Sequence, residues 1–105
     1  MSDQIKTAAL EWINENASLI ADAHQRAWEL AEVGLLEQET GKFLADILEA
    51  NGFTVERGVA GMPTAFVATY GSGGPTIGVM AELDALPGLS QEAVPYRQEI
   101  GRAHV

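Results

Sequence analysis

The chain of 105 residues contains no cysteine and few basic side chains. Without cysteine it can form no disulfide bond and no metal site built on thiolates. Its 6 lysines and arginines are outnumbered by 15 aspartates and glutamates, which gives a formal net charge of −9. A surface of that sign repels phosphate backbones and anionic lipids, so we expect neither a nucleic acid nor a membrane as a partner.

Several patterns that identify common sites and signals are also missing. The first residues lack the charged-then-apolar order of a signal peptide, and no apolar run approaches the length of a membrane span, so we expect a cytoplasmic protein. The glycine-rich stretch 71–75 is not followed by Lys-Ser/Thr and a helix, which excludes a phosphate-binding P-loop. No serine stands in a nucleophile-elbow pattern, and His24 has no second ligand one helical turn away.

The amino-terminal half has the periodicity of helices, within a composition typical of one folded domain. Steps of three and four between apolar residues predict a helix from about residue 4 to 33 that ends near Gly34. A second helix is expected over 38–50, followed by Asn51-Gly52 as its left-handed stop. The expected buried residues are Ala9, Trp12, Ile13, Leu19, Ile20, Ala23, Ala27, Leu30 and Ala31 in the first helix, and Phe43, Leu44, Ile47 and Leu48 in the second.

The following segment has the patterns of strands. Three are expected, over 53–57, 65–70 and 76–81, and the glycine-rich connection 71–75 predicts that the last two form a hairpin. The third is apolar on both faces, so it needs helices on both sides and further strands beside it. Two helices and then three strands therefore predict an α/β fold, as the amino-terminal part of a larger three-layer domain.

Glu82 and Asp84 are the candidate site residues. They follow the third expected strand and are two residues apart, so on an extended backbone both carboxylates point to one face. Ligands and metals gather beyond the carboxyl ends of strands in α/β sheets, which indicates metal or acid/base chemistry. Spacing alone favours a simpler alternative, an acidic strand end that meets water, because such a pair is a weak motif.

Four segments of the sequence resemble the amino terminus of a known enzyme family. They are Trp28-Glu29-Leu30-Ala31-Glu32-Val33-Gly34, Glu39-Thr40, Gly61-Met62-Pro63-Thr64-Ala65-Phe66-Val67-Ala68 and residues 81–91. Together they are similar to metal-dependent amidohydrolases of the aminoacylase/carboxypeptidase-like peptidase family, over about residues 10–98. The most similar branch is that of the p-aminobenzoyl-glutamate hydrolase B subunits.

The resemblance implies hydrolysis of the amide bond of an N-acyl amino acid, with p-aminobenzoyl-glutamate as the favoured substrate class. It implies one or two divalent metals, Zn or Mn, a sheet flanked by helices, an inserted lid domain and a homo- or hetero-oligomer. Many relatives carry His-x-Asp-x-Val/Leu-Pro at the strand end. By this resemblance Asp84 matches the family aspartate in a supporting role, and Glu82 stands in the place of the metal-binding histidine.

The replacement of the family histidine by glutamate weakens the assignment of Glu82 to the site. The resemblance also places the metal ligands in later segments that this sequence does not contain. We therefore expect residues 1–99 to be an inactive amino-terminal portion of such an enzyme. The alternative is a short acidic interaction module, derived from this fold, that does not catalyse a reaction. Residues 100–105, Ile-Gly-Arg-Ala-His-Val, match one reading frame of a common sequencing adapter, so we expect them to be a non-native tail without a role for His104.

Overall fold

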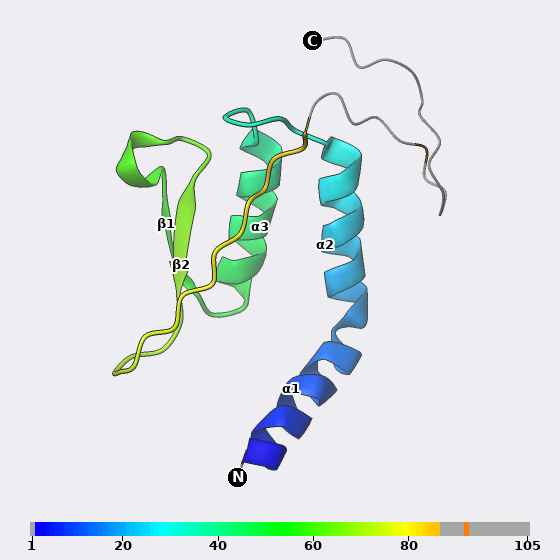
Figure 1. The fold of residues 1–105 in the computed structure, drawn as a ribbon, viewed down its shortest axis with the longest axis vertical. Helices are drawn as coiled ribbons and strands as arrows, with labels where there is room; N and C mark the ends of the chain where they lie inside the picture. Colours follow the sequence, from blue (N-terminus) through cyan, green and yellow to red (C-terminus); the bar gives the residue numbers. More distant parts are fainter. Residues whose placement is uncertain (1, 87–91, 93–105) are drawn as a thin grey trace. The chain divides into compact units, whose positions relative to one another are not determined.

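The computed structural model describes residues 2–86 and 92. It shows a mixed α/β fold, as the sequence predicts, in two compact units. Among the described residues, the amino-terminal unit, Met1–Leu30, contains helices only, and the carboxyl-terminal unit, Ala31–Val105, contains one α-helix, a short 3-10 turn and a small sheet (Figure 1). The expected adapter-derived tail, 100–105, lies outside the described residues.

The amino-terminal unit has two helices where the sequence predicts one. They are α1 (Ser2–Glu15) and α2 (Ala17–Leu30), and their axes change direction at Asn16 (Figure 1). The Asn16 side-chain amide donates a hydrogen bond to the carbonyl oxygen of Trp12 at 2.9 Å, a local bond that competes with regular helix. The predicted end at Gly34 is also wrong, because α2 stops at Leu30 and Ala31 adopts a positive φ of 42°.

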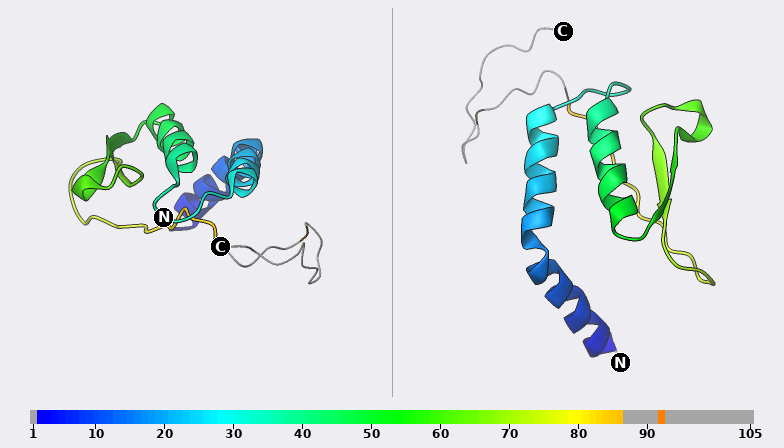
Figure 2. Two further views of the ribbon diagram at one scale, coloured as in Figure 1. Left: turned by 90° about the horizontal axis from the view of Figure 1, so that it is seen from above. Right: turned by 180° about the vertical axis from the view of Figure 1, so that it is seen from behind.

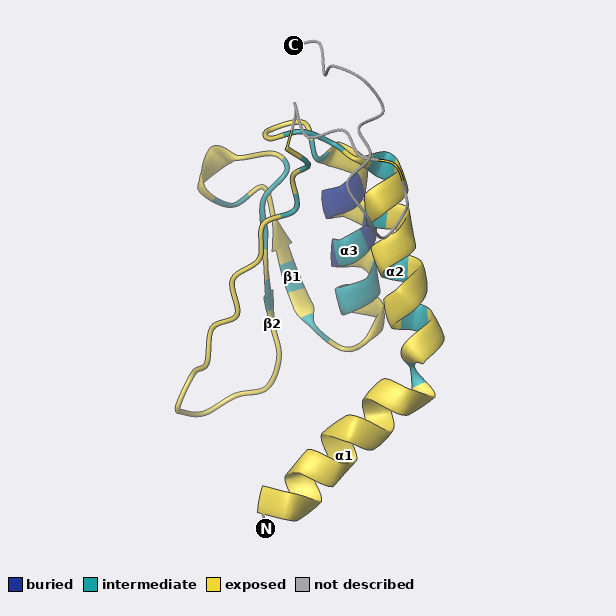
Figure 3. Ribbon diagram, turned by 45° about the vertical axis from the view of Figure 1, so that its right-hand side comes forward, coloured by how far each residue is buried: buried dark blue, intermediate teal, exposed yellow. Residues whose placement is uncertain are grey.

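The apolar stripe predicted to be buried on this first helix is not buried. Neither α1 nor α2 contains a buried residue, and Trp12, Ile13, Ile20 and Trp28 are all about half exposed (Figure 3). The helices follow one another end to end, so within their own unit neither offers the other a long packing face. Periodicity correctly predicts that residues 2–15 and 17–30 are helical, but it predicts neither the division into two helices nor the exposure of their apolar residues.

Helix α3 (Gln38–Ala50) has the bounds that the sequence predicts. It ends in a Schellman motif, in which the Phe53 amide donates to the Leu48 carbonyl oxygen at 3.0 Å and the Gly52 amide donates to that of Glu49 at 3.2 Å. Gly52 has the positive φ of 93° that this stop requires. Phe43 is buried as expected, whereas the other apolar residues predicted for its inner face are half-buried: Leu44, Ile47 and Leu48.

The sheet consists of two antiparallel strands, β1 (Thr54–Arg57) and β2 (Phe66–Thr69). Their register pairs Thr54 with Thr69 and Arg57 with Phe66. Residues 58–65 connect them through a short 3-10 turn, η1 (Val59–Gly61). Helix α3 packs against both strands, and Figure 2 shows this arrangement from two further directions.

The predicted hairpin between 65–70 and 76–81 is therefore wrong, because β2 pairs with the preceding strand. Residues 76–81 form no strand, and Ile77, Val79 and Met80 are 86%, 93% and 96% exposed. A strand that is apolar on both faces is stable only between neighbouring strands and covering helices. The described part of the chain provides no such neighbours for residues 76–81, so the segment stays extended and unpaired.

The buried centre of the carboxyl-terminal unit is small. Its buried residues among those described are Thr40, Gly41, Phe43 and Ala45, all on α3 (Figure 3). At the surface, the Asp46 carboxylate accepts a hydrogen bond from the Arg57 guanidinium at 2.7 Å and lies 3.4 Å from the Lys42 ammonium. The Arg57 pair links β1 to α3, whereas the Lys42 pair lies within α3, and both are exposed, so they contribute little to the stability of the fold.

Candidate functional site

The candidate residues Glu82 and Asp84 lie on an extended segment that returns to the start of α3. Figure 1 shows this segment, in yellow to orange, running from the end of β2 back to the loop 31–37. There Ala85 forms a parallel β-bridge with Val33, and its amide donates a hydrogen bond to the Glu32 carbonyl oxygen at 2.7 Å. The bridge fixes the main chain immediately beside Asp84.

The side chains of this segment alternate as the sequence predicts. Leu83 and Ala85 are half-buried, whereas Glu82 and Asp84 are both exposed. The two candidate carboxylates therefore share the outward side of an extended backbone. This agrees with a site that faces a ligand and equally with the alternative of an acidic end that faces water.

Glu32 caps the first turn of α3 from outside the helix. One carboxylate oxygen accepts hydrogen bonds from the Thr40 amide and the Thr40 hydroxyl, both at 2.6 Å. The other oxygen accepts the Glu39 amide at 3.1 Å. These amides are among the four that a helix leaves unpaired at its start, and a negative charge there also interacts favourably with the helix dipole. Thr40 is 1% exposed, so its buried hydroxyl depends on Glu32 for a partner.

A second carboxylate, that of Glu37, lies near Asp84 across Gly34. A methyl group placed on Gly34 would lie 3.8 Å from Asp84 Oδ2 and 3.9 Å from Glu37 Oε1. Glu37 Oε1 also accepts a hydrogen bond from the Leu35 amide at 3.0 Å, which closes the loop on itself. Loop 31–37 therefore brings Glu32, Glu37 and Asp84 to one end of the carboxyl-terminal unit.

The hydrogen bonds at this end favour the charged carboxylates. The Thr40 hydroxyl, followed by the Thr40 amide, holds the pKa of Glu32 below the ordinary value of 4.5. The backbone amide of Glu37 itself, followed by the Thr64 side chain, lowers the pKa of the Glu37 carboxyl. At neutral pH both groups are ionised, so this end of the unit presents a concentrated negative charge.

The lowered pKa of Glu32 predicts a specific loss of stability in acid. Its folded pKa lies below its unfolded pKa, so its contribution is complete above about 4.5 and disappears as the pH falls through the folded pKa. Urea unfolding at several pH values should show Glu32→Gln less stable than the native chain at pH 7, with the difference shrinking below pH 4. A difference that stays constant down to pH 3 would contradict this assignment.

The described residues do not by themselves fit a metal ion. Among residues 2–86 and 92, no three Asp, Glu, His or Cys side chains lie together in a way that could hold one. Glu82 and Asp84 supply at most two oxygen ligands, whereas structural and catalytic zinc sites use three or four protein ligands. His24, on α2, is in the other unit.

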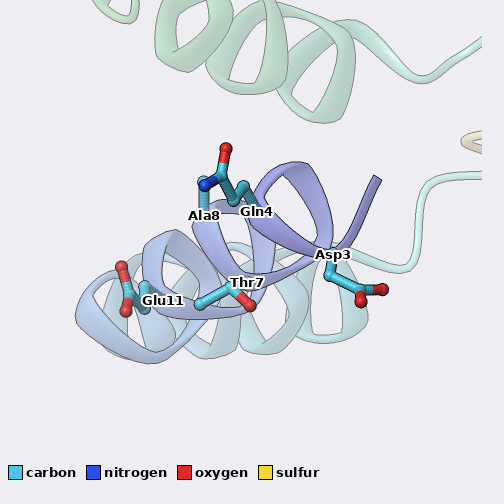
Figure 4. A pocket seen from close by; sticks show the side chains of 5 residues that line it. All are labelled: Asp3, Gln4, Thr7, Ala8 and Glu11. Atoms are coloured by element: carbon cyan, nitrogen blue, oxygen red, sulfur yellow. The ribbon is translucent and has the colours of Figure 1, made fainter. Parts of the chain in front are cut away.

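Two hollows of the described surface do not involve Glu82 or Asp84. The larger, about 300 Å³, is an open depression on α1, and Figure 4 shows that all its lining residues come from this helix: Asp3, Gln4, Thr7, Ala8 and Glu11. The smaller, about 210 Å³, lies where α3 meets Arg57 and residues 63–66. Neither is a built catalytic cleft.

No helix in the described part of the chain is long and apolar enough to span a bilayer.

The sequence predicts Asp84 and Glu82 as site residues, and it does not predict the connection between Glu32 and Thr40. One local signal was available. The residue before α3 is Glu37, and neither it nor its neighbour Leu36 is a preferred amino-terminal cap. A helix start without its own cap needs an acceptor from elsewhere in the chain, and Glu32 is a nearby carboxylate.

The comparisons with known proteins give one relative. Over 72 residues the chain is 43% identical to the B subunit of p-aminobenzoyl-glutamate hydrolase from Escherichia coli strain K12. The matched region is 69% of this chain and 15% of that protein, so the chain spans only a small part of its relative's length. No family model matches, and no solved structure matches significantly. The chain is thus related in sequence to a hydrolase subunit.

Proposed function

We propose that this chain is the amino-terminal part of a metal-dependent amidohydrolase that cleaves the amide bond of an N-acyl amino acid resembling p-aminobenzoyl-glutamate. The observation that carries the proposal is its 43% identity to a p-aminobenzoyl-glutamate hydrolase subunit. The fold is compatible with it, because Glu82 and Asp84 are both exposed on one segment that a β-bridge holds beside the start of α3.

In this proposal Asp84 has a supporting role at the site, and Glu82 a weaker one. The catalytic metal, Zn or Mn, is held by residues other than those described, since these form no ligand set. The 105-residue chain alone is then inactive. The whole enzyme is a cytoplasmic homo- or hetero-oligomer, and the name of the relative, a subunit, supports an assembly.

A segment exchange tests the proposal directly. The 72-residue region of the E. coli protein that matches this chain is replaced by the corresponding region of this chain, and the assembled hydrolase is assayed for release of p-aminobenzoate. We expect the chimera to hydrolyse p-aminobenzoyl-glutamate in the presence of Mn²⁺ or Zn²⁺ and to lose that activity with a chelator. The 105-residue chain alone should show no turnover under the same conditions.

The control is a chimera of the same length that carries Asp84→Asn, which removes one charge from an exposed position. It should assemble like its parent and have a lower kcat. A parent chimera that assembles but does not hydrolyse the amide would contradict the proposal. So would metal-dependent turnover by the 105-residue chain, because that chain would then not need the missing ligands. An inactive parent together with a cooperative melt of the short chain favours the non-catalytic interaction module.

A further inference from the structure

We propose that Glu32 is a positioning residue for Asp84. Its side chain anchors loop 31–37 to the start of α3, and its main chain binds the segment that carries Asp84. The inference rests on the proposed function only for what Asp84 does in hydrolysis. Where Asp84 is held, and by what, is tested on the chain itself.

The first step is the side-chain anchor. The Glu32 carboxylate accepts three hydrogen bonds at 2.6 to 3.1 Å, two from backbone amides and one from the Thr40 hydroxyl. Bonds to an ionised acceptor are stronger than those between neutral groups, and three of them leave the side chain little freedom. The position of Glu32 is thus fixed relative to α3, the most buried element of the unit.

The second step is the main-chain link. The carbonyl oxygen of the same residue accepts the Ala85 amide at 2.7 Å, and its neighbour Val33 forms the bridge with Ala85. Asp84 directly precedes Ala85, so only one peptide unit separates the candidate carboxylate from this attachment. This bridge is the only β-pairing of residues 76–86 in the described part of the chain. Asp84 is therefore held in place through Glu32.

The chemistry of the anchor calls for glutamate. The anchor uses both side-chain oxygens as acceptors, and the three groups hydrogen-bonded to them are all donors. Glutamine keeps one oxygen but turns an NH₂ group, a donor, toward another donor. Aspartate is one methylene shorter, so it cannot reach both amides without a shift of the loop. A change at Glu32 is thus transmitted to Asp84 through loop 31–37 while the β1–β2 pair is untouched.

Amide hydrogen exchange on the 105-residue chain tests the placement. In Glu32→Gln, and in the nearly isosteric Thr40→Val, the Ala85 amide should exchange about tenfold faster than in the native chain. The Gly58 amide, which donates to the Ala65 carbonyl oxygen at 2.8 Å in the hairpin, should accelerate less than Ala85, by no more than the loss of unfolding free energy of each variant explains. Thr40→Ser keeps the hydroxyl and should restore slow exchange at Ala85.

The matched control is Asp46→Asn, which also replaces a carboxylate with an amide, but on α3 itself, on the side that binds Arg57. It should leave the exchange of Ala85 unchanged. If Glu32→Gln accelerates Ala85 and Gly58 equally, Glu32 merely stabilises the whole unit and the proposal is wrong. Unchanged exchange at Ala85 would overturn it as well.

The segment-exchange chimera gives the functional readout. Glu32→Gln should lower kcat in the same direction as Asp84→Asn and leave KM unchanged, because a displaced Asp84 affects the reaction more than substrate binding. If the parent chimera is active and Glu32→Gln leaves its kcat unchanged, the positioning role is wrong. If the parent chimera is inactive, the proposed function fails, and the exchange experiment still decides whether Glu32 places Asp84.

Discussion

Replacing Phe43 with alanine should unfold the carboxyl-terminal unit at 25 °C. Phe43 is 5% exposed and is the only large apolar side chain among the described residues that is fully buried. Removing such a ring costs about 3–5 kcal/mol, which is comparable to the whole stability of a small domain. Urea titration should be followed by the amide NMR signals of β1 and β2, because Trp12 and Trp28 both lie in the amino-terminal unit.

Met80→Ala is the matched control for this experiment. It also removes a large apolar side chain, but from a residue that is 96% exposed. The unfolding free energy should therefore change only as for a surface substitution, by about 0.5 kcal/mol or less. Phe43→Leu should fall between the two variants, because leucine refills most of the space. Equal midpoints for Phe43→Ala and Met80→Ala would show that α3 is not the centre of the fold.

Replacing Gly41 with alanine should also destabilise the unit, although alanine is the better helix former. A methyl group on Gly41 would lie 2.9 Å from the carbonyl oxygen of Thr64, closer than ordinary contacts allow, and this atom belongs to backbone. Overpacking costs up to about 3 kcal/mol, whereas the gain in helix propensity is about 1 kcal/mol. We expect a net loss of about 2 kcal/mol in urea unfolding.

Gly34→Ala provides the comparison for Gly41→Ala. Its added methyl group would have no neighbour closer than 3.8 Å, so its unfolding free energy should change by less than about 0.5 kcal/mol. A Gly41→Ala chain as stable as the native one would mean that residues 63–65 do not pack closely on α3. The pair therefore measures how tightly the β1–β2 connection is held against the helix.

Local signals in the sequence were sufficient for α3 and insufficient for its neighbours. The helix carries a clear apolar period and the Asn51-Gly52 stop, and both act within a few residues. The change of direction at Asn16 accompanies a side-chain hydrogen bond to the Trp12 carbonyl oxygen, which periodicity does not detect, while the backbone bonds of Asn16 to Trp12 and Ile20 keep the helical pattern. The apolar period therefore predicts the start of a helical segment more reliably than it predicts how far the helix continues without a break.

Strand pairing was the main error, and it has a physical cause. Glycine-containing connections, 58–63 and 71–75, lie on both sides of residues 65–70, and either one is compatible with a hairpin. Glycines take positive φ in both connections, Gly58 and Gly61 in the first and Gly71 and Gly73 in the second, so this does not distinguish them. The structure selects the first, where α3 packs against both strands. That choice depends on tertiary packing, which short-range patterns do not encode.

One feature of the candidate site could be predicted from local spacing, and one could not. The alternation that turns Glu82 and Asp84 outward follows from an extended backbone and can be recognised from spacing. The connection from Thr40 through Glu32 to Ala85 joins residues that are far apart in sequence. Only the folded chain shows that the cap of α3 and the position of Asp84 depend on one residue.

The exposed segment 76–81 has a consequence for how copies of this chain behave at high concentration. Within the described part of the chain its amides and carbonyls form no β-pairing, its residues are uncharged, and Ile77, Val79 and Met80 are accessible. These are the properties of a template for intermolecular cross-β assembly. The net charge of −9 opposes the approach of a second copy. Salt screens that repulsion, so we expect association of the chain to increase with ionic strength.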